Sequence, residues 1–528
     1  MPQRIRWSSP WIPLGLFPLA LAYRWVWSTM VPPGRNHDAA ENAVAAAQVW
    51  HGGADLLFIR GRGLEKEPLF QALLSGAMTF LEGEQALLWV SLLLGAAAAP
   101  AVWMLARAAG LRGGALVSAA WVTCGAWPLL YSVAGMRVVA ALALSAAGLA
   151  GALAIERRWR EQQTPSIPLL VGTGVMLTLP LYAYTSARIV CAAAIGWLAV
   201  LAVVRRPSGP ARQGAWIGLG LLPAVPWLAA LLGPAGRETL LRGSYIFLAD
   251  GADRWRLFLD AALLPFHVGW EYAPVSRPGF IADGAATVFP LAGTPPVALP
   301  FAALLAAGLV VGIVDTVRRP RATAPSLALA VWGTHLLILG FAGPSATRLL
   351  LAVPALALLM GWGAERLAGW LGGSRAAVAL AACAILAAAG GAWESARLAR
   401  LVDHPLAWSN FPDAVAVAAD LGVDMPPDRT PVVVIPRARS VVELAQRRRP
   451  GMEIAEFYEA PGRLDDIPPL PADARPVYLV VRHPNTELIL ADLVARHPGG
   501  VWTPVPGPGG RTFDELTLHL FDPEGELP

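Results

Sequence analysis

Eleven apolar runs dominate this sequence and constrain what it can fold into. They lie at about residues 11–31, 85–106, 114–133, 136–155, 166–185, 187–204, 214–233, 297–317, 323–343, 347–370 and 375–396. A helix needs roughly 20 apolar residues to cross a bilayer, and backbone groups in lipid must be hydrogen-bonded within their own segment. The composition agrees, with 55% hydrophobic and only 15% charged residues. The chain is therefore predicted to be an α-helical polytopic membrane protein with about 11 transmembrane helices.

Arginines mark one side of the predicted bundle. They cluster in alternate connections and at the N-terminus, as Arg4, Arg6, Arg107, Arg112, Arg157, Arg158, Arg160, Arg205, Arg206, Arg212, Arg318, Arg319, Arg321, Arg366 and Arg375. The positive-inside rule makes this side cytoplasmic. The first run is too long for a signal peptide and has no small-residue cleavage site after it, so it is read as a span. Eleven spans then predict a multi-pass protein of the cytoplasmic (inner) membrane, with its N-terminus in the cytoplasm and its C-terminus in the periplasm or outside.

The predicted domain division follows from this topology. Residues 1–397 form the transmembrane domain, with long outer loops at 32–84 and 234–296, and residues 398–528 form a small extracytoplasmic α/β domain. Short apolar segments bounded by turn residues predict strands at 430–436, 476–482 and 516–522, with helices at 413–421 and 485–497. The segment from Pro504 to Gly510 is interpreted as a loop, and no catalytic motif is found in this domain.

The second outer loop contains an amphipathic segment. Trp255, Phe258, Leu259, Ala262 and Leu263 follow helical spacing, and charged residues occupy the other face. This pattern predicts a helix that lies in the membrane interface. Packing against another span is the alternative.

Basic residues at the outer ends of the spans need a separate explanation, because outer loops are normally poor in them. The first loop carries Arg60, Arg62 and Lys66, the only lysine beside 40 arginines, and Arg137, Arg188 and Arg348 stand at later outer turns. Arginine presents a planar fork to phosphate, whereas lysine is a compact point charge. The set predicts a phosphate site. For any single arginine, snorkelling to lipid phosphates is the alternative, and Arg24, within the first span, is expected to snorkel outward in this way.

Acidic residues accompany these cations in the first loop. Asp38 and Glu41 have the spacing of a capping box, so both can simply start a helix, and Glu65 and Glu67 flank Lys66. At a helix N-terminus a carboxylate such as Asp38 stays ionised and can act as a base. His37 and His51 lack a metal-binding spacing, and Cys124, Cys191 and Cys383 stand alone. Neither a disulfide framework nor a cysteine-metal site is indicated, and a metal requirement is left open.

Several of these elements together resemble a known family. HDAAENA, EKEPLF, SVAGMR, LYAYTSAR (with Tyr184) and TRLLLAVPALALL occur in this order over about residues 10–370. They resemble the GT-C membrane glycosyltransferases, and within them the protein O-mannosyltransferase and lipid A aminoarabinose transferase family (glycosyltransferase family 39-like). Members often carry an acidic dipeptide at the first position, whereas here Asp38 is followed by Ala39.

The resemblance implies an inverting transfer of a sugar from a polyprenyl-phosphate donor to a lipid, glycan or protein acceptor. Asp38 would be the general base, and Glu67 would orient Lys66 or bind a sugar hydroxyl. Lys66, Arg137, Arg188 and Arg348 would bind the donor phosphate. Secondary candidates are Glu41, Arg60, Arg62 and Tyr184.

A transporter and a membrane scaffold are the alternatives to a transferase. A transporter or flippase of lipid-linked glycans would be expected to place ionisable residues at the bilayer midplane, where only His335 and Arg24 come near. A non-catalytic membrane scaffold would need no outer basic ring. No nucleotide-binding glycine motif is present, in keeping with a lipid-linked donor, and membrane lipids but no nucleic acid are the expected partners.

Overall fold

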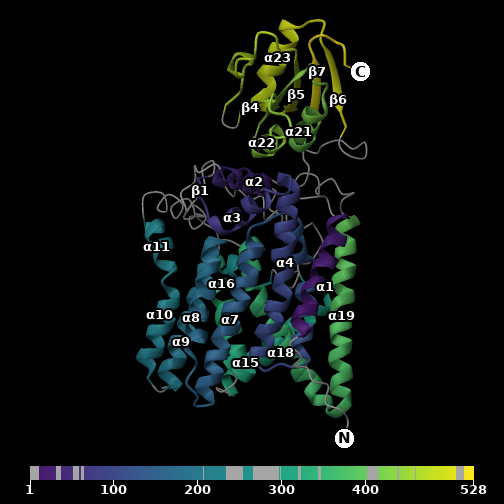
Figure 1. Ribbon diagram of the computed structural model, residues 1–528. Coiled ribbons are helices and arrows are strands. Elements are labelled where there is room, and N and C mark those ends of the chain that lie inside the picture. The colour runs from purple at the N-terminus through teal and green to yellow at the C-terminus, as the bar shows by residue number, and fades with distance from the viewer. Residues whose placement is uncertain are drawn as a thin grey trace.

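The structure is a computed structural model, and its helices occupy every one of the eleven apolar runs (Figure 1). The residues that it describes are 11–30, 37–50, 59–60, 65–205, 207, 209–232, 254–263, 265, 297, 299–318, 323–342, 346–400, 414–436, 439–457, 460–506 and 517–527. The helices of the membrane part are α1 (Trp11–Ser28), α4 (Gly83–Ala108), α5 (Gly114–Cys124), α6 (Ala126–Val133), α7 (Val138–Arg160), α8 (Ile167–Thr178), α9 (Arg188–Arg205), α10 (Pro210–Leu221), α11 (Ala224–Leu232), α15 (Leu299–Arg318), α16 (Thr323–Ala342), α17 (Ala346–Leu349), α18 (Val353–Leu371) and α19 (Gly373–Arg400).

Within the described residues, six of these helices are long and apolar enough to cross a membrane by themselves, namely α4, α7, α9, most of α15, α18 with the turn before it, and most of α19. The pair α5 and α6 passes the same test as one span, bent by 42° at Gly125. The chain is a multi-pass membrane protein. The crossing number of eleven and the orientation of the termini stay predictions.

The first outer loop folds at one end of the bundle (Figure 1). It contains α2 (His37–Trp50), the antiparallel pair β1 (Ile59–Arg60) and β2 (Glu65–Lys66), and α3 (Pro68–Ala77). In the second outer loop the predicted amphipathic helix is present as α13 (Arg254–Leu263), and it packs against α16. Phe258 and Ala262 contact the core, as the alternative of packing on a span required. Trp255 and Leu259 stay exposed.

The C-terminal domain is built on a five-stranded sheet with the order β4-β3-β5-β7-β6, in which β4, β3 and β5 are parallel. Its elements are α21 (Ala414–Asp424), β3 (Thr430–Ile435), α22 (Arg439–Gln446), β4 (Glu453–Glu456), β5 (Pro476–Arg482), α23 (Glu487–Arg496), β6 (Val501–Val505) and β7 (Thr517–Asp522). The three predicted strands and two predicted helices are all present. The predicted division at 397/398 falls in the last turn of α19, which continues to Arg400.

The interpretation of Pro504–Gly510 as a loop is wrong at its start. Pro504 and Val505 belong to β6, where Pro504 is paired with His519. Proline donates no backbone hydrogen bond, which an edge strand can tolerate. Because β6 is the last strand of the sheet, only β7 contacts it along its length.

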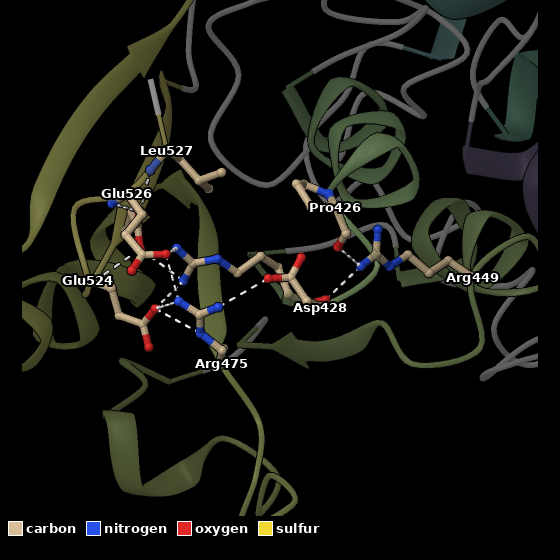
Figure 2. A network of polar contacts seen from close by, with 9 residues as sticks. Pro426, Asp428, Arg449, Arg475, Glu524, Glu526 and Leu527 are labelled. Atoms are coloured by element: carbon tan, nitrogen blue, oxygen red, sulfur yellow. Dashed lines mark hydrogen bonds and ion pairs between the residues drawn. The ribbon is translucent and has the colours of Figure 1, made fainter.

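Charged side chains hold the end of the chain against this sheet (Figure 2). The buried guanidinium of Arg429 contacts Asp522 at 3.4 Å, Glu524 at 2.8 Å and Glu526 at 3.1 Å. Arg475, which is more exposed, binds Asp428, Glu524 and Glu526. Asp522 in turn accepts hydrogen bonds from the backbone N–H groups of Glu524, Glu526 and Leu527. The last residues are thereby fixed as a turn next to β7.

This network predicts that the C-terminal turn loosens in acid. Burial works against the charge of Asp522, but the three backbone N–H groups and Arg429 outweigh it and lower its pKa, and Arg475 lowers the pKa of Glu524. A carboxyl group whose pKa is lowered by folding stabilises the fold above its unfolded pKa of about 4, and this contribution is lost as the pH falls through the lowered value. Hydrogen exchange of residues 517–527 in the full-length protein, corrected for intrinsic rates, is expected to accelerate below about pH 4.

Two arginine variants provide the matched comparison at neutral pH. Arg429→Met removes the cation from the buried Asp522 and is expected to destabilise the turn by about 3 kcal/mol. Arg475→Met removes a more exposed cation and should have a much smaller effect on the turn. Equal exchange rates in the two variants would show that burial of Arg429 does not matter to this turn.

Candidate functional site

An ion pair between Glu67 and Arg137 lies at the end of the bundle where the first loop folds. Glu67 directly precedes α3 in extended backbone and is only 2% exposed. Its Oε2 is 3.4 Å from Nε of Arg137, the residue that precedes α7. The guanidinium of Arg137 also lies over the ring of Tyr184, 5.6 Å from its centre. Three segments that are far apart in the sequence therefore meet here.

The turn that presents Arg137 requires a glycine. Gly135 has a φ of +71°, and a Cβ at this position would lie within about 3 Å of the side chain of Leu87 in α4. Only glycine adopts this left-handed conformation without cost, and only glycine fits against Leu87. The sequence SVAGMR therefore makes a tight turn between α6 and α7, and Arg137 is held at its end.

Two further arginines belong to the same cluster. Arg188 begins α9 and interacts electrostatically with both Glu67 and Arg348, and Arg348 lies in α17 just before α18. Two short 3₁₀ turns, Leu179–Tyr182 and Thr185–Ala187, replace the helix between α8 and α9 and place Tyr184 and Arg188 at the mouth of the bundle. Among the described side chains of this cluster, three arginines accompany one glutamate, an excess of positive charge that suits an anion.

A buried polar pair ties α2 to α3. Nε2 of Gln71 donates a hydrogen bond to Oδ1 of Asn42 at 3.3 Å, and both side chains are at most 2% exposed. Asp38 stands one helical turn before Asn42, and Glu67 stands four residues before Gln71. The pair therefore fixes the helix that begins at Asp38 against the helix that follows Glu67.

The C-terminal domain closes over this end of the bundle. Its helix α22 packs on α2, and Leu444 of α22 reaches the start of α4, where a Cβ at Gly83 would lie 2.9 Å from it. A cavity of about 40 Å³ at this seam is lined by Ala40, Gly135 and Leu444 among others. This volume holds a few water molecules and is too small for a sugar. The seam is thus a packed contact that reaches both α2 and the turn before Arg137.

The remaining sequence-predicted residues are placed as far as the structure describes them. Asp38 lies in the first turn of α2, Arg60 in β1 and Lys66 in β2, with their side chains outside the described part. Arg62 and His51 lie outside the described residues, as does the side chain of His37. Glu41 is buried on α2, 8% exposed. In the described part of the chain, no three His, Cys, Asp or Glu residues lie together as a metal site would require.

The sequence reasoning missed Asn42 and Gln71. The available signal was an amide one helical turn after an acidic residue, Asn42 after Asp38 and Gln71 after Glu67. The prediction that Arg24 snorkels outward is wrong. Arg24 is instead completely buried, with its guanidinium bonded to backbone carbonyl groups of α5 and to Ser132. Its partners lie at the break between α5 and α6, which the sequence did not reveal.

Solved structures resemble this chain in fold. ArnT from Cupriavidus metallidurans bound to undecaprenyl phosphate matches with a TM-score of 0.58 at 14% identity, covering 97% of this chain and 98% of ArnT. The apo state of the same protein matches with a TM-score of 0.57 at 15% identity, covering 96% and 98%. The oligosaccharyltransferase of Archaeoglobus fulgidus in complex with Zn and sulfate gives 0.49 at 13% identity, covering 93% and 72%.

No family model and no curated protein matches the sequence. The structural likeness to ArnT confirms the GT-C fold expected from the resemblance. Because it covers 97% of the chain, it extends beyond residues 10–370 and includes most of the C-terminal domain.

Proposed function

We propose that this protein is an integral membrane glycosyltransferase that moves a sugar from a polyprenyl-phosphate donor to an acceptor at the outer face of the cytoplasmic membrane. The observation that carries the proposal is the arginine cluster around Glu67, formed by Arg137, Arg188 and Arg348 at one end of the bundle. The fold supports it, since ArnT shares this fold and has been crystallised with undecaprenyl phosphate. A polyprenyl phosphate would place its anionic group at this arginine cluster and its polyprenyl chain among the membrane lipids.

In the proposed reaction, an acceptor hydroxyl attacks the anomeric carbon of the donor sugar and inverts it. Asp38 accepts the hydroxyl proton, the new C–O bond forms, and the bond from the anomeric carbon to the phosphate oxygen breaks. The electron pair of that bond leaves with the polyprenyl phosphate. General base catalysis of this kind typically contributes about 10²–10⁴ in rate.

The departing phosphate needs charge stabilisation more than it needs a proton. Arginines that are already fixed by their surroundings supply this without reorganising during the reaction. Arg137 is fixed in this sense by Glu67 on one side and by the ring of Tyr184 on the other. Arg188, Arg348 and Lys66 add positive charge, and the attraction of Glu67 offsets part of the repulsion among the cations.

Transfer by the purified protein tests the proposal. The protein in detergent is incubated with polyprenyl-phosphate-linked pentoses and hexoses and with lipid, glycan and protein acceptors, and acceptor-bound sugar is measured. A flippase would move the labelled lipid across a vesicle membrane without transferring its sugar. A scaffold would do neither, so the absence of transfer with every donor would refute the proposal.

Lys66 gives a sharper test of the donor site. It stands in β2 directly before the buried Glu67. If its ammonium binds the donor phosphate, Lys66→Ala should weaken binding of polyprenyl phosphate roughly tenfold. Lys66→Arg should rescue binding only in part, because a wide planar fork does not occupy the space of a point charge. The affinity of purified wild type and both variants is measured directly.

A role restricted to the loop surface gives a different result. An exposed pair of Lys66 with Glu65 would be worth about 0–1 kcal/mol, and both substitutions would then be almost silent. Equal affinity in all three proteins would remove Lys66 from the site.

A further inference from the structure

Arg24 is a completely buried charged residue near the end of α1, within the membrane part of the protein. Its Nη2 donates a hydrogen bond to the carbonyl oxygen of Val122 at 2.8 Å, and its Nη1 donates to that of Thr123 at 3.3 Å. On the other side its Nε donates to the hydroxyl of Ser132 at 3.3 Å. One guanidinium therefore contacts the end of α5 and the end of α6, on both sides of the 42° bend.

The carbonyl groups at the end of α5 explain why a cation is placed here. The last four carbonyl groups of a helix lack helical partners, and in a membrane each unsatisfied group is costly. Gly125 N–H donates to the carbonyl of Trp121, Arg24 binds those of Val122 and Thr123, and the hydroxyl of Tyr23 binds that of Cys124. A cation is also favourable at the negative end of the helix dipole. The pair Tyr23 and Arg24 thus completes the end of α5.

The contact between Arg24 and Ser132 is closely packed by neighbouring helices. The hydroxyl of Ser132 donates to the carbonyl of Pro128 at 2.7 Å, so its oxygen is free to accept from Arg24. A Cβ at Gly95 in α4 would lie 2.1 Å from that oxygen and 3.2 Å from Nε of Arg24. The hydroxyl of Tyr23 is also 3.1 Å from that of Ser395 in α19. Helices α1, α4 and α19 each pack against both α5 and α6.

Only a short stretch of chain separates the break from Arg137. Helix α6 has only eight residues, and Ser132, the Arg24 partner near its end, is five residues before Arg137. Between them lies only the glycine turn that is packed on Leu87. A change in the direction of α6 therefore moves the guanidinium of Arg137 relative to Glu67.

We propose that Arg24 is a positioning residue for the anion site: by holding both sides of the α5–α6 break it sets the place of Arg137. The part that concerns a phosphate ligand rests on the proposed function, whereas the part that concerns the break does not. Arg24 itself touches neither Glu67 nor Arg137 among its described hydrogen bonds, so its effect is transmitted through α6.

Two variants separate positioning from general stability. Ser132→Ala removes the contact from Arg24 to α6, together with the bond of the Ser132 hydroxyl to Pro128 within that helix, and it leaves the cap of α5 intact. Arg24→Lys keeps the charge but cannot span both helices. Gln213→Ala is the control, because it removes a similarly buried contact, to Nε1 of Trp159, in another part of the bundle. All three are purified in detergent and measured for thermal stability, for hydrogen exchange of residues 126–140 and for affinity to undecaprenyl phosphate.

The expected result is a selective loss. Ser132→Ala and Arg24→Lys should bind undecaprenyl phosphate about tenfold more weakly than wild type and exchange faster at residues 126–140. Gln213→Ala should lower thermal stability to a similar degree without changing either quantity. Arg24→Gln is included as a stronger form of the same change. If it too leaves the exchange of residues 126–140 unaltered, the proposal is overturned.

The two proposals fail in different ways. If the wild-type protein does not bind polyprenyl phosphate but the exchange of residues 126–140 responds to Ser132→Ala, the donor assignment is wrong and the role of Arg24 at the break stands. If wild type binds the lipid and neither variant changes exchange or affinity, the role of Arg24 is wrong and the donor site stands.

Discussion

Asp38→Asn is expected to abolish sugar transfer while the protein still inserts into the membrane and binds the carrier lipid. The amide cannot take up the proton of the acceptor hydroxyl. The rate of sugar transfer should therefore fall by about 10²–10⁴-fold, which is what a general base typically contributes. Asp38 lies in the first turn of α2, where its charge favours the helix by only about 0.3–1 kcal/mol. The fold should survive the substitution, because the Asn42–Gln71 contact and the packing of α22 still hold α2 in place.

Glu41→Gln is the matched control, since it makes the same chemical change one turn further along the same helix. Transfer and lipid binding are measured for both variants at the same folded concentration. Near-normal turnover in Asp38→Asn would mean that Asp38 only starts the helix. The base would then be sought at Glu41 or Glu67, and a loss of transfer in Glu41→Gln would select Glu41.

The spans could be predicted from the sequence because each is largely decided by its own residues. A run of about 20 apolar residues forms a helix in lipid whatever its neighbours are. The bends are different. Runs 114–133, 166–185 and 214–233 each contain a break in helical structure, at Gly125, after Thr178 and after Leu221. Arg24 from another helix binds at the break at Gly125, and Pro180 and Pro223 stand at the other two breaks. A proline alone does not identify a break, because Pro100 lies within the continuous helix α4.

The cluster of basic residues was predictable only in outline. Arginines that are independently assigned to one side of the membrane are expected near one another, and Arg137, Arg188 and Arg348 do lie around Glu67. Which of them contacts the carboxylate depends on the turn at Gly135 and on the packing of its neighbours, which local patterns do not encode. The same reason explains the error about Arg24. Snorkelling is a sound expectation for an arginine that faces lipid, but Arg24 faces the end of α5.

In the C-terminal domain, the longer strands were the ones that could be predicted from the sequence. The strands β3, β5 and β7 have six or seven residues with a clear apolar pattern. The missed strand β4 has four residues and begins and ends with glutamate, and β6 contains a proline. Helix α22 has only eight residues and was not predicted, although its apolar side chains lie on one face. It nevertheless makes the contact with α2, so the element that links the two domains was among those least visible in the sequence.

The second large effect is expected when Arg137 is replaced by glutamine. The donor phosphate loses a fixed guanidinium, and removing one such group typically costs about 10²–10³ in turnover. The variant also removes an ion-pair partner from Glu67, whose side chain is 3% exposed. Breaking a buried pair from one side costs about 3–5 kcal/mol, so part of the loss will reflect stability rather than catalysis.

The double variant Glu67→Gln/Arg137→Gln separates the two effects. It replaces both charges by neutral side chains, which removes the uncompensated buried carboxylate and should restore most of the thermal stability. If Arg137 serves only the fold, affinity for undecaprenyl phosphate should return with stability. If it binds the phosphate, the affinity should stay low in a protein that is as stable as wild type, and transfer is not compared because Glu67 is itself a candidate catalytic residue.

An exposed pair calibrates the measurement. Arg157 and Glu161 form a pair at 3.0 Å near the end of α7 remote from the site, and its side chains are 56% and 38% exposed. Arg157→Gln should change stability by no more than about 0.5 kcal/mol and leave lipid binding unaltered. If the double variant binds the lipid as well as Arg157→Gln does, Arg137 has a structural role only. The phosphate would then be assigned to Arg188 and Arg348.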